Sequence, residues 1–152
     1  MTGTLGLKFS STHIYSALVD MVNGNPTLPA KGDHTIPSNQ TPGEFADWAE
    51  TQIDLIVQAS QPDQIRYKLT SGLAKHDQIF GIYFAIAILN LAAFKAQVPI
   101  SYLTPTQLQA TAFGLPRRTS LDAYISSLFP NQPSPWNSNV REAVAIALRG
   151  LL

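Results

Sequence analysis

An apolar stretch from residue 79 to residue 94, bounded by Asp77 and Lys95, constrains the fold of this chain more than any other feature. It contains Asn90, and it falls short of the roughly 20 apolar residues that a helix needs to cross a bilayer. The stretch therefore predicts a buried helix over residues 77–97, which Pro99 stops. A helix that is apolar on all sides must have other elements packed around it, so we expect a layered domain and no membrane contact.

The remaining segments predict a mixed α/β architecture. A chain of 152 residues favours one domain, spanning 1–152, and it can bury a core without disulfides, which the absence of cysteine excludes. Pro29 and Pro37 limit the third strand to weak, edge-like pairing. Strands are predicted at 5–9, 13–22, within 27–36, at 65–69 and at 100–103, and helices from 41 to 57, over 77–97, from 105 to Gly114, over 120–129 and from 139 to the end, with Gly72 in a linker.

The charged residues are few and unevenly placed. Only 13% of residues are charged, against about a quarter in an average soluble domain, which indicates a permanent partner. Residues 1–62 hold six acids and two bases, whereas residues 63–152 hold four acids and eight bases. We therefore expect an anionic ligand to meet the second half of the chain. Residues 1–9 lack the features of a signal peptide, so we expect a cytoplasmic location.

Several common catalytic layouts are missing from the sequence. It has neither a Gly-x-Ser-x-Gly elbow nor a Gly-x-x-x-x-Gly-Lys phosphate loop, and no Gly-x-Gly-x-x-Gly follows a predicted strand. The 3 histidines are widely spread and do not have zinc-ligand spacing. We therefore expect neither a cofactor nor a bound metal.

The order of the predicted elements and the residues from 98 to 148 resemble the RuvC branch of the ribonuclease H-like superfamily. The resemblance is clearest in the strand Val98-Pro99-Ile100-Ser101-Tyr102, and in the ending Asn139-Val140-Arg141-Glu142-Ala143-Val144-Ala145-Ile146-Ala147-Leu148. It implies a ribonuclease H-like mixed sheet, in which antiparallel N-terminal strands are followed by parallel strands and flanked by helices.

The resemblance also implies where a nuclease site would lie. Members of the family use four carboxylates to hold two divalent cations that activate a water for phosphodiester cleavage. The four corresponding positions are Lys8, Lys68, Asn139 and Glu142, so three of the four acids are degenerate. Two lysines, an amide and one glutamate give a site charge of roughly +1, which repels divalent cations.

Each of these vestigial positions has a plainer interpretation. Lys8 and Lys68 would pair with Glu142 in a salt bridge, or the three would hold an anion. Asn139 followed by Glu142 also fits a capping box at the start of the last helix. A relocated nuclease site would require Asp20 or Asp77 to enter it, although Asp77 is explained as an acid at a helix start.

Nucleic acid is the ligand that the resemblance and the charge distribution favour. The predicted contacts are Lys75, His76, Arg117 and Arg118, on the side where the central strands end. The leading hypothesis is a catalytically inactive RuvC-like domain that is retained for binding nucleic acid, DNA or RNA, or another anion within a larger assembly. The alternatives are a structural interaction subunit that binds no nucleic acid, and a metal-dependent nuclease with relocated acids.

The apolar helix predicts an interface as well as a core. One of its faces must cover the sheet, which leaves a second apolar face for another helix or another chain. The family that the sequence resembles dimerises through the corresponding helix. We therefore expect a homodimer, or a contact within a complex, with an interface at Ile79, Ile82, Tyr83 and Ile86.

Overall fold

A five-stranded sheet organises the protein, in the order β3-β2-β1-β4-β5. The computed structural model describes residues 3–70 and 75–152, apart from the side chain of Asp77, so Gly72 and that side chain lie outside the description. The strands are β1 (Thr4–Phe9), β2 (His13–Val22), β3 (Asn25–Thr35), β4 (Gln64–Lys68) and β5 (Ile100–Leu103). The first three pair antiparallel, whereas β4 runs parallel to both β1 and β5. This mixed sheet confirms the predicted fold class.

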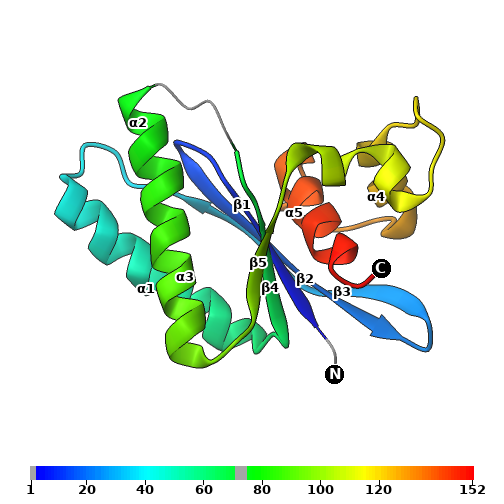
Figure 1. The fold of residues 1–152 in the computed structure, drawn as a ribbon, viewed down its shortest axis with the longest axis horizontal. Helices are drawn as coiled ribbons and strands as arrows, with labels where there is room; N and C mark the ends of the chain where they lie inside the picture. The colour runs from blue at the N-terminus through cyan, green and yellow to red at the C-terminus, as the bar shows by residue number, and fades with distance from the viewer. Residues whose placement is uncertain (1–2, 71–74) are drawn as a thin grey trace.

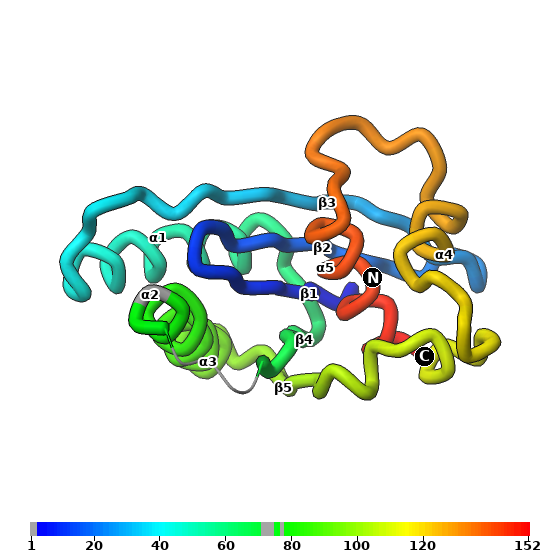
Figure 2. The backbone as a smooth tube through the Cα atoms, turned by 90° about the horizontal axis from the view of Figure 1, so that it is seen from above, coloured from blue at the N-terminus to red at the C-terminus, as the bar shows by residue number. Residues whose placement is uncertain are grey.

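Helices cover both faces of the sheet (Figures 1 and 2). On one face lie α1 (Pro42–Ser60) and a long helix made of α2 (His76–Gln78), η1 (Ile79–Phe84) and α3 (Ala85–Ala96). On the other face lie α5 (Ser138–Arg149) and, packed against it, α4 (Leu121–Leu128). Two short 3₁₀ helices, η2 (Pro105–Leu108) and η3 (Ala110–Phe113), connect β5 to α4. The sheet therefore separates two hydrophobic cores.

Side chains of β4 alternate between these two cores, as the two-residue period of a strand requires. Ile65 and Tyr67 are buried in the core under α1 and α3. Gln64, Arg66 and Lys68 are half-buried, and the first and last of them contact α5 through hydrogen bonds. The α5 side of β4 therefore carries a row of polar side chains, with two cations at its carboxyl end.

The last helix approaches the sheet closely because β1 has a glycine beneath it. A Cβ atom at Gly6 would lie 2.2 Å from the carbonyl oxygen of Ala143 and 2.6 Å from the backbone nitrogen of Ala147. Both alanines are fully buried. Because Gly6 has no side chain and the facing residues of α5 are alanines, the backbone of α5 packs directly on β1. This packing determines where the first half of α5, with Glu142, lies.

Three sequence expectations need correction. The third strand is stronger than expected, because β3 extends over 11 residues and pairs with β2 along most of its length, while its place at the edge of the sheet confirms the predicted edge-like pairing. Its prolines are compatible with this because β3 is an edge strand, where one side needs no partner. The predicted helix over 77–97 contains a π-helical segment, η1. The predicted short helix ending at Gly114 is two 3₁₀ turns.

The apolar helix reaches from Ile79 to Ala96, and its 18 residues make it long and apolar enough to cross a membrane by length and composition. A core helix meets the same criteria. Here Ile82, Ala85 and Leu89 pack into the core beneath the sheet, beside α1. The sheet and α1 cover this side of the helix, as the sequence analysis expected.

Candidate functional site

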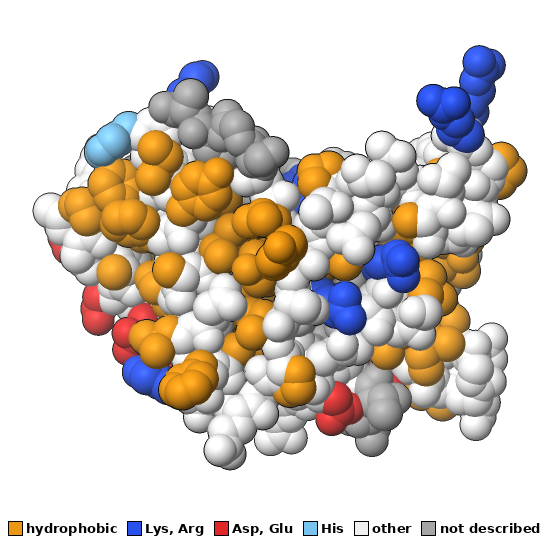
Figure 3. Space-filling model, viewed as in Figure 1, with side chains coloured by type: hydrophobic (Ala, Val, Ile, Leu, Met, Phe, Trp, Pro, Cys, Tyr) orange, Lys and Arg blue, Asp and Glu red, His pale blue; other side chains and the backbone are white. Residues whose placement is uncertain are grey.

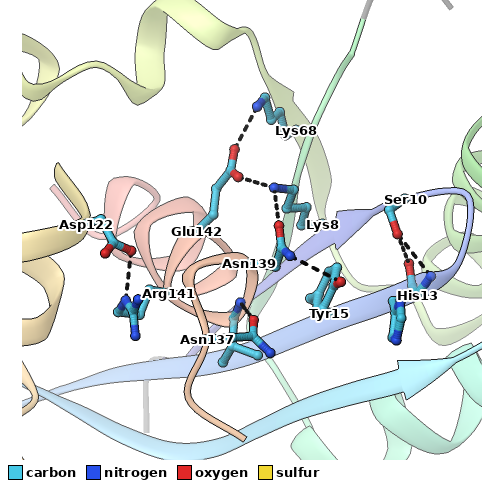
Figure 4. Close-up of polar contacts among 11 residues, drawn as sticks. Lys8, Ser10, His13, Tyr15, Lys68, Asp122, Asn137, Asn139, Arg141 and Glu142 are labelled. Atoms are coloured by element: carbon cyan, nitrogen blue, oxygen red, sulfur yellow. Dashed lines mark hydrogen bonds and ion pairs between the residues drawn. The ribbon is translucent and has the colours of Figure 1, made fainter. Parts of the chain in front are cut away.

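One carboxylate joins two lysines at the carboxyl ends of the central strands (Figure 4). Lys8 lies near the end of β1, Lys68 is the last residue of β4, and Glu142 lies in the first half of α5. Lys68 donates from Nζ to Glu142 Oε1 over 2.6 Å, and Lys8 donates from Nζ to Glu142 Oε2. The side chains are 20%, 24% and 25% exposed for Lys8, Lys68 and Glu142, so the cluster is largely withdrawn from water. We call these three residues the Lys–Glu–Lys cluster.

Asn139 belongs to the same network. Its Oδ1 accepts a hydrogen bond from Lys8 Nζ over 2.7 Å, and its Nδ2 donates to the Tyr15 hydroxyl over 3.2 Å. Asn139 and Glu142 are three residues apart on α5, so they occupy one face of the helix. The structure therefore brings together all four positions that the resemblance singled out.

Tyr15 is the residue of this network that the sequence analysis missed. Burial raises the pKa of its hydroxyl, and the negative charge of Asp33 raises that pKa further, so the phenol stays protonated. Tyr15 lies directly opposite Lys8 in the β1–β2 pairing. The tight connection through residues 10–12 sets this register, so counting back across it would have placed Tyr15 beside Lys8.

Asn139 does not cap the last helix, contrary to the expected capping box. The N-cap is Asn137, whose side-chain oxygen accepts from the backbone N–H of Val140 over 3.0 Å. The helix begins at Ser138, so Asn139 and Glu142 both lie inside it. With the capping role taken by Asn137, the side chains of Asn139 and Glu142 are directed to the lysines.

The electrostatics of the cluster favour an ionised carboxylate and an overall positive site. Burial raises the pKa of Glu142, but the hydrogen bonds and charges of Lys68 and Lys8 outweigh burial and hold that pKa below its usual value. One negative charge between two ammonium groups leaves a net charge of about +1.

The cluster does not fit a pair of divalent cations. Two hard cations require several oxygen ligands, whereas both oxygens of Glu142 already accept from lysines. Within the residues that the structure describes, no group of three or more histidine, cysteine or acidic side chains is placed to hold a metal ion.

Asp20, one of the two acids considered for a relocated site, does not reach the cluster. Asp20 is buried near the far end of β2, where Val19 pairs with Thr4 at the start of β1, whereas Lys8 lies near the end of β1. Its Oδ1 accepts from the backbone N–H of Met21. The side chain of Asp77 lies outside the description.

Arg141 points away from the cluster, although it is next to Glu142 in the sequence. Its Nε donates to Asp122 Oδ1 over 2.7 Å (Figure 4). Its Nη1 donates to the carbonyl oxygen of Trp136 over 2.9 Å. The guanidinium also lies 5.7 Å from the centre of the Trp136 ring, within the range of a cation–π interaction. Arg141 therefore links α5 to α4 and to the loop that precedes α5.

The predicted nucleic-acid contacts lie on two segments that flank the cluster. Lys75 and His76 are exposed at the start of α2, and His76 packs edge-on against Phe80 with 4.4 Å between ring centres. Arg117 and Arg118 are exposed on the loop that precedes α4. In the view of Figures 1 and 3, these segments form the two upper corners of the molecule, Lys and Arg side chains project there, and the surface between them is hollowed. We call this region the upper edge.

The predicted helix interface is partly wrong. Ile82 and Ile86 are buried in the core against the sheet, and Ile79 is half-buried, because the helix turns this side toward α1 and the strands. Only Tyr83 of the predicted set is exposed. Besides Tyr83, the large apolar side chains exposed in this region are Phe84, Leu91 and Phe94 on the helix and Tyr102 on β5.

Comparison with solved structures identifies the fold. No protein-family model matches the chain, and no curated protein sequence matches it. Thermus thermophilus RuvC in complex with a Holliday junction substrate superimposes with a TM-score of 0.81 and 17% identity, over 98% of this chain and 92% of that chain. The chain has the RuvC fold. The yeast mitochondrial Holliday junction resolvase Ydc2 superimposes with a TM-score of 0.72 and 9% identity, over 97% of this chain and 78% of its own.

A more distant match completes this comparison. The fowlpox virus Holliday junction resolvase has a TM-score of 0.53 and 12% identity, over 99% of this chain and 95% of that chain. The structure thus confirms the predicted RuvC-like, ribonuclease H-like architecture along nearly the whole chain. The protein combines the RuvC fold with a Lys–Glu–Lys cluster at the ends of β1 and β4.

Proposed function

We propose that this RuvC-fold domain binds nucleic acid and does not cut it. The observation that carries the proposal is the Lys–Glu–Lys cluster, in which lysines stand at two positions where the resemblance implies metal-binding acids. Ammonium groups repel the divalent cations that activate water in this chemistry, and the single carboxylate is already occupied. Hydrolysis through a metal-activated water therefore has no support at this site.

The distribution of positive charge supports retained binding. Exposed bases stand on both sides of the hollowed upper edge, and the cluster between them carries a net positive charge. Phosphate groups are attracted to such an arrangement whatever the base sequence. The Thermus RuvC structure is a complex with a Holliday junction substrate, and the yeast and fowlpox proteins are described as Holliday junction resolvases, so a four-way DNA junction is the natural probe.

A cleavage assay tests the proposal that the domain does not cut nucleic acid. The protein is incubated with a labelled four-way junction in Mg²⁺ or Mn²⁺, and we expect intact DNA. Cleavage that is lost in Glu142→Ala but kept in Glu50→Ala, an exposed acid of α1, would overturn the proposal.

A binding titration tests the interface. We expect affinity for the junction to fall steeply with salt and to weaken about tenfold or more in Arg117→Ala/Arg118→Ala, because each phosphate contact releases counterions. The matched control is Lys31→Ala/Lys95→Ala, which removes the same charge from the middle of β3 and from the end of α3, away from the segments that carry the predicted contacts. Equal affinity of both double variants, or no binding by the parent, would contradict the proposal.

A second candidate is a structural subunit that binds no nucleic acid. The exposed apolar side chains on α3 and β5 favour it, with Phe94 80% exposed and Tyr102 52% exposed. Such a cluster is typical of a protein contact. We propose that this face associates with a second copy of the chain or with another subunit, and this association is compatible with nucleic-acid binding at the upper edge. The salt titration above separates the two candidates, because a purely structural subunit would show no affinity for the junction at any salt concentration.

A further inference from the structure

We propose that Arg66 and Arg149 form an oxyanion site that takes a backbone phosphate of the bound nucleic acid, away from the Lys–Glu–Lys cluster. Arg66 is on the α5 side of β4, and Arg149 is the last residue of α5. The phosphate identity rests on the function proposed above. The site itself rests on two guanidinium groups that have no anionic partner within the described part of the chain.

Both arginines have unsatisfied hydrogen-bonding groups. The Nε atom of each is buried and makes no hydrogen bond to any described residue. Neither guanidinium forms an ion pair with a carboxylate of residues 3–70 or 75–152, the side chain of Asp77 excepted. A buried donor without a partner costs free energy, and two such donors on cations indicate a missing anion.

The sheet neighbours of Arg66 explain why no internal partner reaches it. Across the strands, Arg66 lies opposite Gly6 on β1 and Ser101 on β5. Along its own side of β4 the next residues are Gln64 and Lys68. These neighbours are neutral or positive, and Gln64 is engaged with Thr4 and the carbonyl oxygen of Gly150. Ser101 is exposed, and its hydroxyl is a further donor that an anion beside Arg66 could use.

The end of α5 brings the second arginine to this place. A Cβ atom at Gly150 would lie 2.9 Å from Thr4 Cγ2 and 3.1 Å from Arg66 Cγ, so the helix end rests directly on the side chain of Arg66. Arg149 is the adjacent residue. Figure 3 shows Lys and Arg side chains on the face where the C-terminal end of α5 meets the sheet.

The geometry of guanidinium groups sets the ligand class. Arginine forks bind phosphate or carboxylate oxygens through paired N–H donors. Lys68 and Arg66 are two residues apart on the same side of β4, so their Cα atoms are about 6 to 7 Å apart. A strand of nucleic acid that leaves the upper edge beside Lys68 therefore meets Arg66 and Arg149 next. This continuity favours a phosphodiester over the carboxylates of a protein partner.

The test uses inorganic phosphate, so it does not depend on nucleic-acid binding. We expect phosphate to raise the melting temperature of the parent by about 2 to 5 °C relative to chloride at equal ionic strength. Arg66→Gln/Arg149→Gln should lose this shift, and Lys31→Gln/Lys95→Gln should keep it. If the double variant is poorly folded, Arg149→Gln alone gives the same comparison. An equal shift in parent and arginine variants would overturn the site, because phosphate also stabilises proteins by exclusion from their surface.

The junction titration then tests the phosphate assignment. Loss of one phosphate contact should reduce the steepness of log affinity against log salt by about 1 in Arg66→Gln/Arg149→Gln. If the variant loses the phosphate-induced rise in melting temperature and still shows the salt slope of the parent, that result would reject nucleic acid as the source of the anion. If the parent binds no DNA while phosphate still stabilises it through these arginines, the proposed function fails and the oxyanion site stands.

Discussion

Lys68 and Glu142 lie 2.6 Å apart between Nζ and Oε1, and this contact joins the carboxyl end of β4 to the first half of α5. Lys8 binds the other oxygen of the same carboxylate from β1. One side chain thus connects two neighbouring strands and the helix that covers them. In a metal-dependent nuclease of this fold class, cations would make these connections. Here the protein makes them with its own ammonium groups.

Replacing Glu142 with glutamine should destabilise the fold by about 1 to 3 kcal/mol, because two partly buried ammonium groups then lack their counter-charge. Urea unfolding of parent and variant measures the difference. Glu50→Gln, on the exposed side of α1, is the control and should stay within about 0.5 kcal/mol of the parent. An unchanged midpoint for Glu142→Gln would show that the cluster contributes nothing to stability.

The contribution of Glu142 should depend on pH in a defined direction. Its pKa in the folded protein is held below 4.5 by the lysines, so its stabilising effect is complete at neutral pH. The effect is lost as pH falls through the folded-state pKa, because a protonated glutamate resembles glutamine. The unfolding free energies of parent and Glu142→Gln should therefore converge in acid. A gap that stays constant down to pH 3 would argue against an ionised cluster.

Restoring acids should restore cation binding. Lys8→Asp, Lys68→Glu and Asn139→Asp together surround Glu142 with three further carboxylates, which is a suitable ligand set for Mn²⁺. Calorimetric titration should detect Mn²⁺ binding that the parent lacks. Adding Glu142→Gln to the triple variant should weaken that binding at least tenfold. A well-folded triple variant that binds no Mn²⁺ would count against the correspondence of these positions.

Self-association should depend on the exposed side of α3. Leu91→Glu/Phe94→Glu places two charges on side chains that are 45% and 80% exposed, so folding should tolerate them while an apolar interface should not. Sedimentation equilibrium at micromolar concentration should show a dimer for the parent and a monomer for the variant. Leu55→Glu, at a 55% exposed position of α1, is the control. A monomeric parent would leave only a heteromeric contact for this face.

The sequence predicted the architecture well where patterns are strong. The alternation in residues 5–9 and the amphipathic helix that begins after Thr41 both appear as expected, the latter with the capping box of Thr41 and Glu44. The length of β3 was underestimated because β2 supplies the pairing partner of β3, and the prolines within β3 give no sign of that partner. The side of the long helix that faces the sheet was also predicted wrongly. A segment that is apolar on every side has no periodicity to show that Ile82 and Ile86, and not Leu91 and Phe94, face the sheet.

The site was predicted in position and only partly in its contacts. The resemblance singled out Lys8, Lys68 and Glu142 as one site, and the structure joins them in two ion pairs. Tyr15 was missed because the register across residues 10–12 was not counted back to Lys8, and the N-cap Asn137 was missed because the exact start of a helix is a tertiary outcome. Arg66 and Arg149 were not singled out at all. The helix end lies on the side chain of Arg66 because Gly150 has no side chain, and Arg149 is the residue before that glycine.

The close approach of α5 to Gly6 has a consequence for the order of folding during synthesis. The sheet face that α5 covers belongs to strands made much earlier, and Lys8 is 134 positions away from its partner Glu142. Until the last helix leaves the ribosome, the apolar side chains of β2 on that face and two lysines remain uncovered. The chain therefore completes its second core only in one late event, and the Lys–Glu–Lys cluster closes in that event. A nascent chain stalled before α5 should be a chaperone substrate, although most of its sheet has already been synthesised.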